Sequence, residues 1–187
     1  MLEVDSPTPA LLPEWSAQVA TRGGLNLNIR PASKDDEAAL IEFFGQASAD
    51  DLRFRFLSAV RTVGPSLAHQ LADVDHSRTE SLLAFDASDG RLAASAMIAA
   101  DERLEDAEVA VIVRSDLKGR GAGWAMLAQA CDYAKARGFN RLHSMECAEN
   151  RSAIELEQEM GFTAHPCDGD ASLTILTKSL DVSEAKQ

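Results

Sequence analysis

The sequence predicts a mixed α/β fold in which helices flank a central mixed, mostly antiparallel sheet. Three observations lead to this prediction. Segments with the two-residue period of strands are interspersed with amphipathic helical segments. Two apolar segments flank an Asp-Gly turn, which is typical of an antiparallel hairpin. A third apolar strand runs directly into a glycine-rich turn that opens a helix. At 187 residues the chain has the length of one domain.

The first half of the chain supplies one strand and several helices. Leu25, Leu27 and Ile29 alternate with polar residues and predict a strand over 25–30, which Pro31 ends. Ser33 caps an amphipathic helix that has an acidic first turn and runs to about residue 47. Two shorter helices are predicted, over residues 49–57 and 65–72.

The second half supplies most of the sheet. Residues 80–86 and 91–100 form the hairpin, and residues 108–113 form a buried strand. A long helix covers 120–137 and ends at Gly138, because glycine favours the conformation that closes a helix. A strand over 141–146, a helix over 150–160 and a last strand over 172–177 follow.

These elements divide the chain into three parts. Residues 1–24 contain three prolines and a Gly-Gly pair, so we expect a partly mobile N-terminal arm with a short helix around 14–20. Residues 25–178 form the folded domain, and residues 179–187 are a polar C-terminal tail.

Composition excludes several classes of protein. The net charge of -12 repels phosphodiester backbones, so no nucleic-acid partner is expected, whereas a cationic amine suits this sign. No segment has the roughly 20 consecutive apolar residues of a membrane helix, and the N-terminus does not resemble a signal peptide, so we expect a cytoplasmic protein without a membrane partner. The three cysteines should be reduced thiols, and the four histidines lack ligand spacing, so we expect no metal.

The glycine-rich turn, with Gly119, Gly121 and Gly123, is the most informative segment. Glycines let the backbone approach a phosphate closely, and the first N–H groups of the helix attract anions. A plain strand-to-helix connector is the alternative. The nucleoside-triphosphate loop is excluded because no Lys-Ser or Lys-Thr follows the glycines, and the dinucleotide fingerprint is excluded by the glycine spacing.

The turn does resemble the acetyl-CoA pyrophosphate loop of the GNAT N-acetyltransferase superfamily, usually Gln/Arg-x-x-Gly-x-Gly/Ala, with Lys118, Gly121 and Gly123 at the three positions. Residues 150–162 resemble the later Asn-x-x-Ala-x-x-Leu-Tyr-x-x-x-Gly-Phe segment of that family. The two motifs stand in family order, and the resemblance covers about residues 25–178. It implies a GNAT-like sheet and acetyl-CoA as co-substrate.

The resemblance also implies which residues bind the cofactor. The backbone of Ile112 and Val113 should pair with the pantetheine amides, and Asn150 should contact the cofactor arm, although an ordinary helix cap is an alternative role for Asn150. The residues expected at the pyrophosphate are Lys118, Gly119, Arg120, Gly121, Ala122, Gly123 and Trp124.

Glu108 is the candidate catalytic base. It alternates with Ala110 and Ile112, which places a carboxylate on an otherwise apolar strand face, where burial would make it more basic. Some GNAT enzymes use a glutamate on this strand. A solvated strand end is the alternative, and Glu146 is the reserve candidate.

No general acid is identified from the sequence. Many relatives place a tyrosine seven residues after the motif asparagine to protonate the departing thiolate, and that position is Glu157 here. Together with Glu155 and Glu159, Glu157 is predicted to lie on a solvated helix face. Tyr133 lies too far along its helix and is expected to be structural, and Cys147 is expected to be a buried thiol.

These features predict an acetyl-CoA-dependent N-acetyltransferase in which a primary amine attacks the thioester directly. Residues 28–37, 42–44 and 52–56 resemble the opening of GNAT domains in bacterial protein lysine acetyltransferases, which suggests a lysine on a partner protein as acceptor. A small amine is the alternative acceptor. The sequence leaves open whether the protein forms a homodimer and which acyl length it prefers. The alternative function is a non-catalytic acetyl-CoA-binding sensor or regulatory module.

Overall fold

The computed structural model describes residues 15–58 and 60–180. The described residues form one eight-stranded sheet in the order β1-β2-β3-β4-β5-β6-β8-β7. Neighbouring strands are antiparallel except β5 and β6, which are parallel. This confirms the predicted fold class. The strands are β1 (Ala17–Ala20), β2 (Asn26–Pro31), β3 (Thr79–Asp86), β4 (Leu92–Ala100), β5 (Asp106–Val113), β6 (Arg141–Cys147), β7 (Thr163–Pro166) and β8 (Leu173–Ser179).

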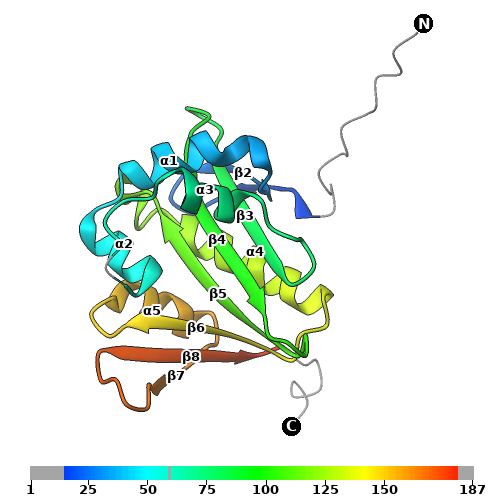
Figure 1. Ribbon diagram of the computed structural model, residues 1–187, viewed down its shortest axis with the longest axis vertical. Coiled ribbons are helices and arrows are strands. Elements are labelled where there is room, and N and C mark those ends of the chain that lie inside the picture. The colour runs from blue at the N-terminus through cyan, green and yellow to red at the C-terminus, as the bar shows by residue number, and fades with distance from the viewer. Residues whose placement is uncertain (1–14, 59, 181–187) are drawn as a thin grey trace, which may run out of the picture.

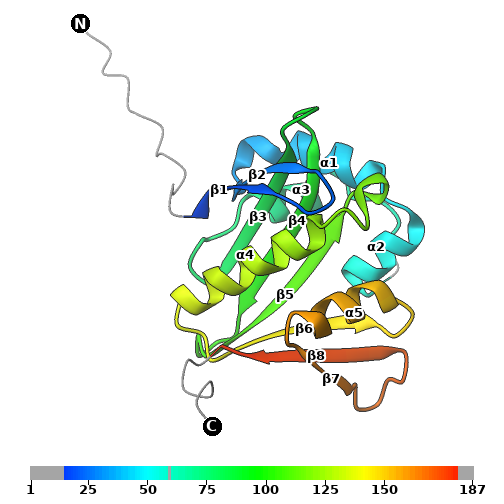
Figure 2. The ribbon, with the colours of Figure 1, turned by 180° about the vertical axis from the view of Figure 1, so that it is seen from behind.

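Helices cover both faces of the sheet. On one face lie α1 (Glu37–Gly45), α2 (Ala49–Phe56) and α3 (Pro65–Ala72), and on the other lie α4 (Ala122–Ala136) and α5 (Arg151–Glu159) (Figures 1 and 2). Each face has its own apolar core, one of which packs Ile112 with α1 and α3, while the other packs Val109 and Leu142 with α4. None of the helices in the described ranges is long and apolar enough to cross a membrane.

Two elements differ from the sequence prediction. The helix predicted around residues 14–20 is wrong, because Ala17–Ala20 forms β1 and pairs with β2 through Ala17 and Ile29. Trp15 then packs edge-on against Tyr133 of α4, with ring centroids 5.0 Å apart. Strand β7 was not predicted. Residues 1–14 of the predicted mobile arm and residues 181–187 of the predicted tail lie outside the described residues.

The parallel strands β5 and β6 separate along their length. Their pairing is limited to three positions, Asp106 with Arg141, Ala107 with Leu142 and Glu108 with His143. Beyond Glu108 the two strands diverge, so the sheet opens between them (Figure 1). Because β5 still pairs with β4 as far as Val113, only one of its edges is left free.

Candidate functional site

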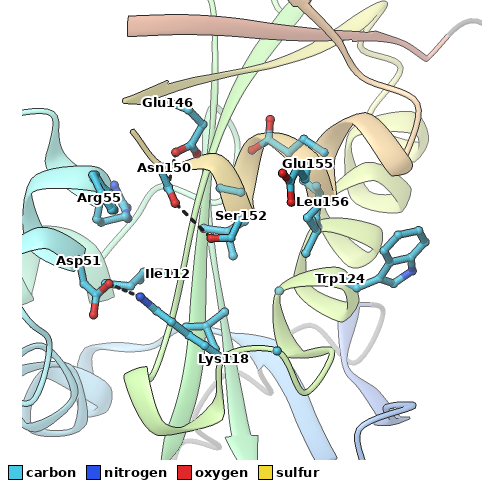
Figure 3. Close-up of a pocket in the computed structure, with 18 of the residues that line it drawn as sticks. Asp51, Arg55, Ile112, Lys118, Trp124, Glu146, Asn150, Ser152, Glu155 and Leu156 are labelled. Carbon is cyan, nitrogen blue, oxygen red and sulfur yellow. Dashed lines mark hydrogen bonds and ion pairs between the residues drawn. The ribbon is translucent and has the colours of Figure 1, made fainter. Parts of the chain in front are cut away.

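A cavity of about 440 Å³ lies where β5 and β6 diverge. Its walls come from β5, the end of β6, the turn before α4, and helices α2 and α5 (Figure 3). This volume is in the range of small-molecule sites. Most of the residues that the sequence singled out therefore meet in one place, although they come from several separate elements between Ile112 and Glu157.

The glycine-rich turn presents unused backbone donors to this cavity. Gly119 and Gly121 have φ of 72° and 87°, a region that other residues rarely adopt, and Gly121 is the N-cap residue of α4. Among the described residues, the N–H groups from Lys118 to Trp124 meet one protein acceptor, the Leu117 carbonyl that accepts from Arg120 at 3.3 Å. The remaining amides at the positive end of a 15-residue helix therefore suit an anion.

The β1–β2 turn holds the glycine-rich turn from outside. The Thr21 hydroxyl donates to the Arg120 carbonyl at 2.7 Å and accepts from the Leu25 N–H at 3.0 Å. A Cβ added to Gly23 would lie 2.5 Å from the Arg120 Cα and carbonyl oxygen. Two segments about a hundred residues apart are thus in direct backbone contact, and glycine is required at position 23.

We predict that Gly23→Ala weakens binding at the glycine-rich turn. The added methyl group collides with backbone, which should cost about 1–3 kcal/mol and displace the turn. Calorimetry with acetyl-CoA should show about a tenfold loss of affinity, and chemical denaturation should show the lower stability. The control is Gly45→Ala at the end of α1, where a Cβ meets nothing within 4 Å. Equal affinity in the two variants would show that the β1–β2 turn does not position the site.

Lys118 is paired rather than free. Its ammonium group bonds to Asp51 of α2, which is buried and also accepts from the Ser115 hydroxyl at 2.7 Å. Burial alone would raise the pKa of Asp51, but the hydrogen bonds from Lys118 and Ser115 outweigh it and lower the pKa. Lys118 therefore ties the turn to α2. Trp124 is 44% exposed and stands at the rim of the cavity (Figure 3).

Along β5, the backbone N–H and carbonyl groups of successive residues point alternately toward β4 and toward the gap. The Arg114 N–H donates to Ala93 of the β4 side, and the Asp101 N–H donates to Asp106, so the even-numbered residues direct their backbone groups to β4. Val111 and Val113 therefore direct their N–H and carbonyl groups into the gap. Of the two residues expected to pair with an extended ligand, Val113 faces the gap, whereas Ile112 contributes a buried side chain.

Asn150 stands at the N-cap position of α5, but its side chain makes no capping bond. Instead its Nδ2 donates to Glu146 Oε2 at 2.7 Å. Asn150 therefore positions Glu146 at the end of β6, a role that the sequence did not suggest.

Glu108 is not buried: its side chain is 51% exposed, as in the alternative of a solvated strand end. It lies at the last position where β5 pairs with β6, and its carboxylate is 3.8 Å from His143 Nε2. Because it alternates with Ile112, its side chain lies on the face that carries α1 to α3. The carboxylate thus stands at the closed end of the gap, outside the cavity lining, and is in contact with water.

Arg55 of α2 is close enough to both Glu108 and Glu146 to interact with them electrostatically. Burial lowers the pKa of Arg55 to about 10, while the negative charges of Glu108 and Glu146 oppose this, so the guanidinium stays charged. Its Nε has no hydrogen-bond partner within the described part of the chain. Arg55 is therefore a cation on the cavity wall, opposite α5 (Figure 3).

Glu157 corrects the sequence prediction most clearly. It does not lie on a solvated face but is 6% exposed and lines the cavity. Burial raises its pKa to about 7, against a hydrogen bond from Ser144 that lowers it. Burial also raises the pKa of Glu146 to about 8, and the charge of Glu157 adds to this shift. Near neutral pH Glu146 therefore remains largely protonated, and Glu157 is about half protonated.

The other candidates have structural surroundings. Tyr133 is buried in the α4 core, and burial raises its pKa to about 12. Cys131, Cys147 and Cys167 are free thiols, as predicted. Burial raises the pKa of Cys147, which makes it a weak nucleophile.

This arrangement suits an extended ligand that carries a diphosphate. The uncapped end of α4 can accept the anion, the free edge of β5 offers donors and acceptors in line, and the gap between β5 and β6 begins just beyond Glu108. An exposed carboxyl group, Glu108, lies on one face of the sheet, and two buried ones, Glu146 and Glu157, lie on the other.

Comparisons with known proteins agree with this geometry. Residues 48–162 match the model of the Acetyltransferase (GNAT) family. The GNAT domain of S. lividans PAT superposes with a TM-score of 0.81 at 24% identity, over 92% of this chain and 99% of that one. A putative acetyltransferase from Salmonella typhimurium, solved with its cofactor acetyl-CoA, gives 0.67 at 22% identity, over 86% and 98%.

A curated relative is similar over a shorter stretch. An uncharacterized N-acetyltransferase of Methanocaldococcus jannaschii is 39% identical over 62 residues, which are 33% of this chain. The chain matches 27% of that relative's length.

Proposed function

Because the chain belongs to the GNAT acetyltransferase family, we propose that it transfers an acetyl group from acetyl-CoA to a primary amine by direct attack on the thioester. The observation that carries this proposal is the gap between β5 and β6, which leads from the uncapped N-terminus of α4 to Glu108. Bound acetyl-CoA would supply the activated acetyl group.

The residues on the α4 face hold the cofactor in this proposal. The amides of Gly119, Gly121, Ala122 and Gly123 bind the diphosphate, and the backbone of Val111 and Val113 pairs with the extended arm. Arg120 adds positive charge at the turn, and Trp124 borders the rim. Orientation of the thioester against the amine lowers the barrier without a covalent enzyme intermediate.

The residues on the opposite face receive the amine. Glu108 takes a proton from the ammonium group so that the nitrogen can attack, because only a neutral amine is nucleophilic. Its exposure supports this role, since a hydrated carboxylate can pass the proton on to solvent. The acceptor is an amine of a protein lysine or of a small molecule, and the acidic chain favours a cation in either case.

The test is thiol release from acetyl-CoA by the purified chain with a polyamine, free amino acids and lysine-containing peptides. Amine-dependent thiol release is expected, and the productive acceptor distinguishes protein lysines from small amines. Calorimetric titration with acetyl-CoA is run beside it. Binding without release by any amine would favour a sensor of acetyl-CoA, and absence of binding would refute both functions.

A further inference from the structure

Two buried carboxyl groups lie together in the wall of the cavity. Glu146 comes from the end of β6 and Glu157 from the middle of α5, with exposed fractions of 7% and 6%. They interact directly, and the charge of Glu157 raises the pKa of Glu146. Because two neighbouring carboxylates in a buried site repel each other, one member of the pair carries a proton.

The neighbours of the pair act as donors on its outer sides. Asn150 Nδ2 donates to Glu146, and the Ser144 hydroxyl donates to Glu157. Each carboxyl group of the pair thus accepts a hydrogen bond from a neighbouring side chain. The pair is thus a connected network and not an orphaned charge.

Charged and titratable groups surround the pair from four other elements. Arg55 of α2 attracts the charged form of Glu146, and Glu108 of β5 lies near the same guanidinium. On the α4 side, burial raises the pKa of the Cys131 thiol, and Lys178 of β8 opposes that shift. Burial outweighs the attraction of Arg55, so the pair holds its proton near neutral pH.

The pair lies on the cofactor side of the sheet. Ser144 and Glu146 alternate with Leu142, which packs in the α4 core, and α5 covers the same face. Glu108 lies on the other face. Extending the pairing of Glu108 with His143 by three residues brings Glu146 level with Val111, across the gap. The pair therefore stands beside the path assigned to the extended cofactor arm.

We propose that the Glu146–Glu157 pair is the proton donor to the sulfur that leaves when the acetyl group is transferred. This inference rests on the proposed acetyltransferase function and adds a catalytic acid to it. Glu157 takes the place of the tyrosine that the resemblance leads one to expect, and Glu146 beside it is the member of the pair that holds its proton to the higher pH.

The step balances in atoms and charge. The amine nitrogen forms the new C–N bond, and the C–S bond breaks with its electron pair going to sulfur. The proton of the pair passes to that sulfur and gives the free thiol. The nitrogen, which is bound as an ammonium ion, gives up two protons through Glu108, one before the attack and one after it. Solvent carries one of them back to the pair and takes up the other, so no other reactant is required.

The first test compares Glu157→Gln and Glu146→Gln with Glu149→Gln. Glutamine keeps the size and hydrogen bonds of the side chain but has no acidic proton. Glu149 is 72% exposed, bonds to Arg53 and does not line the cavity, so it is the matched control. The turnover number kcat should fall roughly 10²-fold in Glu157→Gln and Glu146→Gln, since a positioned acid contributes at least that much. The double variant should be no slower than the worse single variant.

The second test measures how kcat depends on pH, which reports on the protonation of the pair. In the wild-type chain kcat should fall as pH rises past about 8, because the pair then loses its last proton. Ser144→Ala removes a hydrogen bond that lowers the pKa of Glu157, so the fall should move to higher pH. Glu157→Gln should lose the fall, and Glu149→Gln should follow the wild type. If the pair had only a structural role, these substitutions would not shift the pH at which kcat falls.

The outcomes separate the two proposals. Calorimetry should give the same acetyl-CoA affinity for all variants, and thermal melting should show that they are folded. A Glu157→Gln variant with wild-type kcat and an unchanged alkaline limb overturns the proton donor while leaving the acetyltransferase intact. Absence of acetyl-CoA binding by the wild-type chain instead refutes the proposed function on which this inference rests.

Discussion

Gly119→Glu should raise the dissociation constant for acetyl-CoA about 100-fold or more. The new carboxylate would stand among the amides that face the diphosphate, so it would occupy the donors and repel the anion. A Cβ at this position meets nothing within 4 Å, and the substitution therefore leaves the core untouched. Calorimetric titration at moderate ionic strength measures the loss.

Gly90→Glu is the matched control for this effect. Gly90 lies in the β3–β4 turn with φ of 70°, against 72° for Gly119, and its added Cβ also meets open space. Both variants thus suffer the same backbone strain and gain the same charge. If they bind acetyl-CoA equally well, the glycine-rich turn is a connector and not the anion site.

Glu108→Gln should lower kcat by roughly 10²-fold at a pH below the pKa of the amine. In that range the acceptor is bound as an ammonium ion and cannot attack until a base has removed a proton. The loss should shrink as pH rises, because more of the acceptor then arrives neutral. Steady-state rates of thiol release measure this dependence. They should be taken from about pH 6 to about pH 9.5, a range that approaches the pKa of common amines.

Glu102→Gln in the β4–β5 turn is the control, since this residue is exposed and outside the cavity. A uniform loss at every pH would indicate that Glu108 positions the acceptor and does not take its proton. Unchanged rates would remove Glu108 from the mechanism. Glu146 could not replace it near neutral pH, because burial keeps that carboxyl protonated.

The strands and helices of the cofactor half were predictable because local signals agreed with tertiary structure. Gly138 and Gly161 both have positive φ and end helices where the sequence placed those ends. Ala17–Ala20 was mistaken for a helix because its strand conformation comes from pairing with β2 and not from its own pattern. Thr163–Pro166 forms β7 although it ends in proline and lacks apolar alternation, which an edge strand tolerates.

The acidic residues of the site were harder to place. Glu155, Glu157 and Glu159 look like one solvated run, but residues two apart on a helix point to nearly opposite sides. Glu157 instead falls in the stripe of positions 153, 156, 157 and 160, which have helical spacing and are otherwise apolar. That stripe was a signal for burial. The separation of β5 from β6, by contrast, is a tertiary feature that no local pattern encodes.

The buried carboxyl pair also links folding to proton uptake. In the unfolded chain both carboxyls would release their protons near pH 4.5, whereas burial holds them to about pH 7 and 8 in the folded chain. This contribution to the free energy of unfolding is complete below pH 4.5 and is lost as pH rises through 7 and 8. The hydrogen-bonded Asp36 and Asp51 have lowered pKa values, so their contribution is lost in acid instead.

The chain should therefore resist urea best in mildly acidic solution and less well at about pH 9. Replacing both Glu146 and Glu157 by glutamine should flatten that decline in stability. An equal decline in the substituted chain would mean that the pair ionises freely in the folded protein.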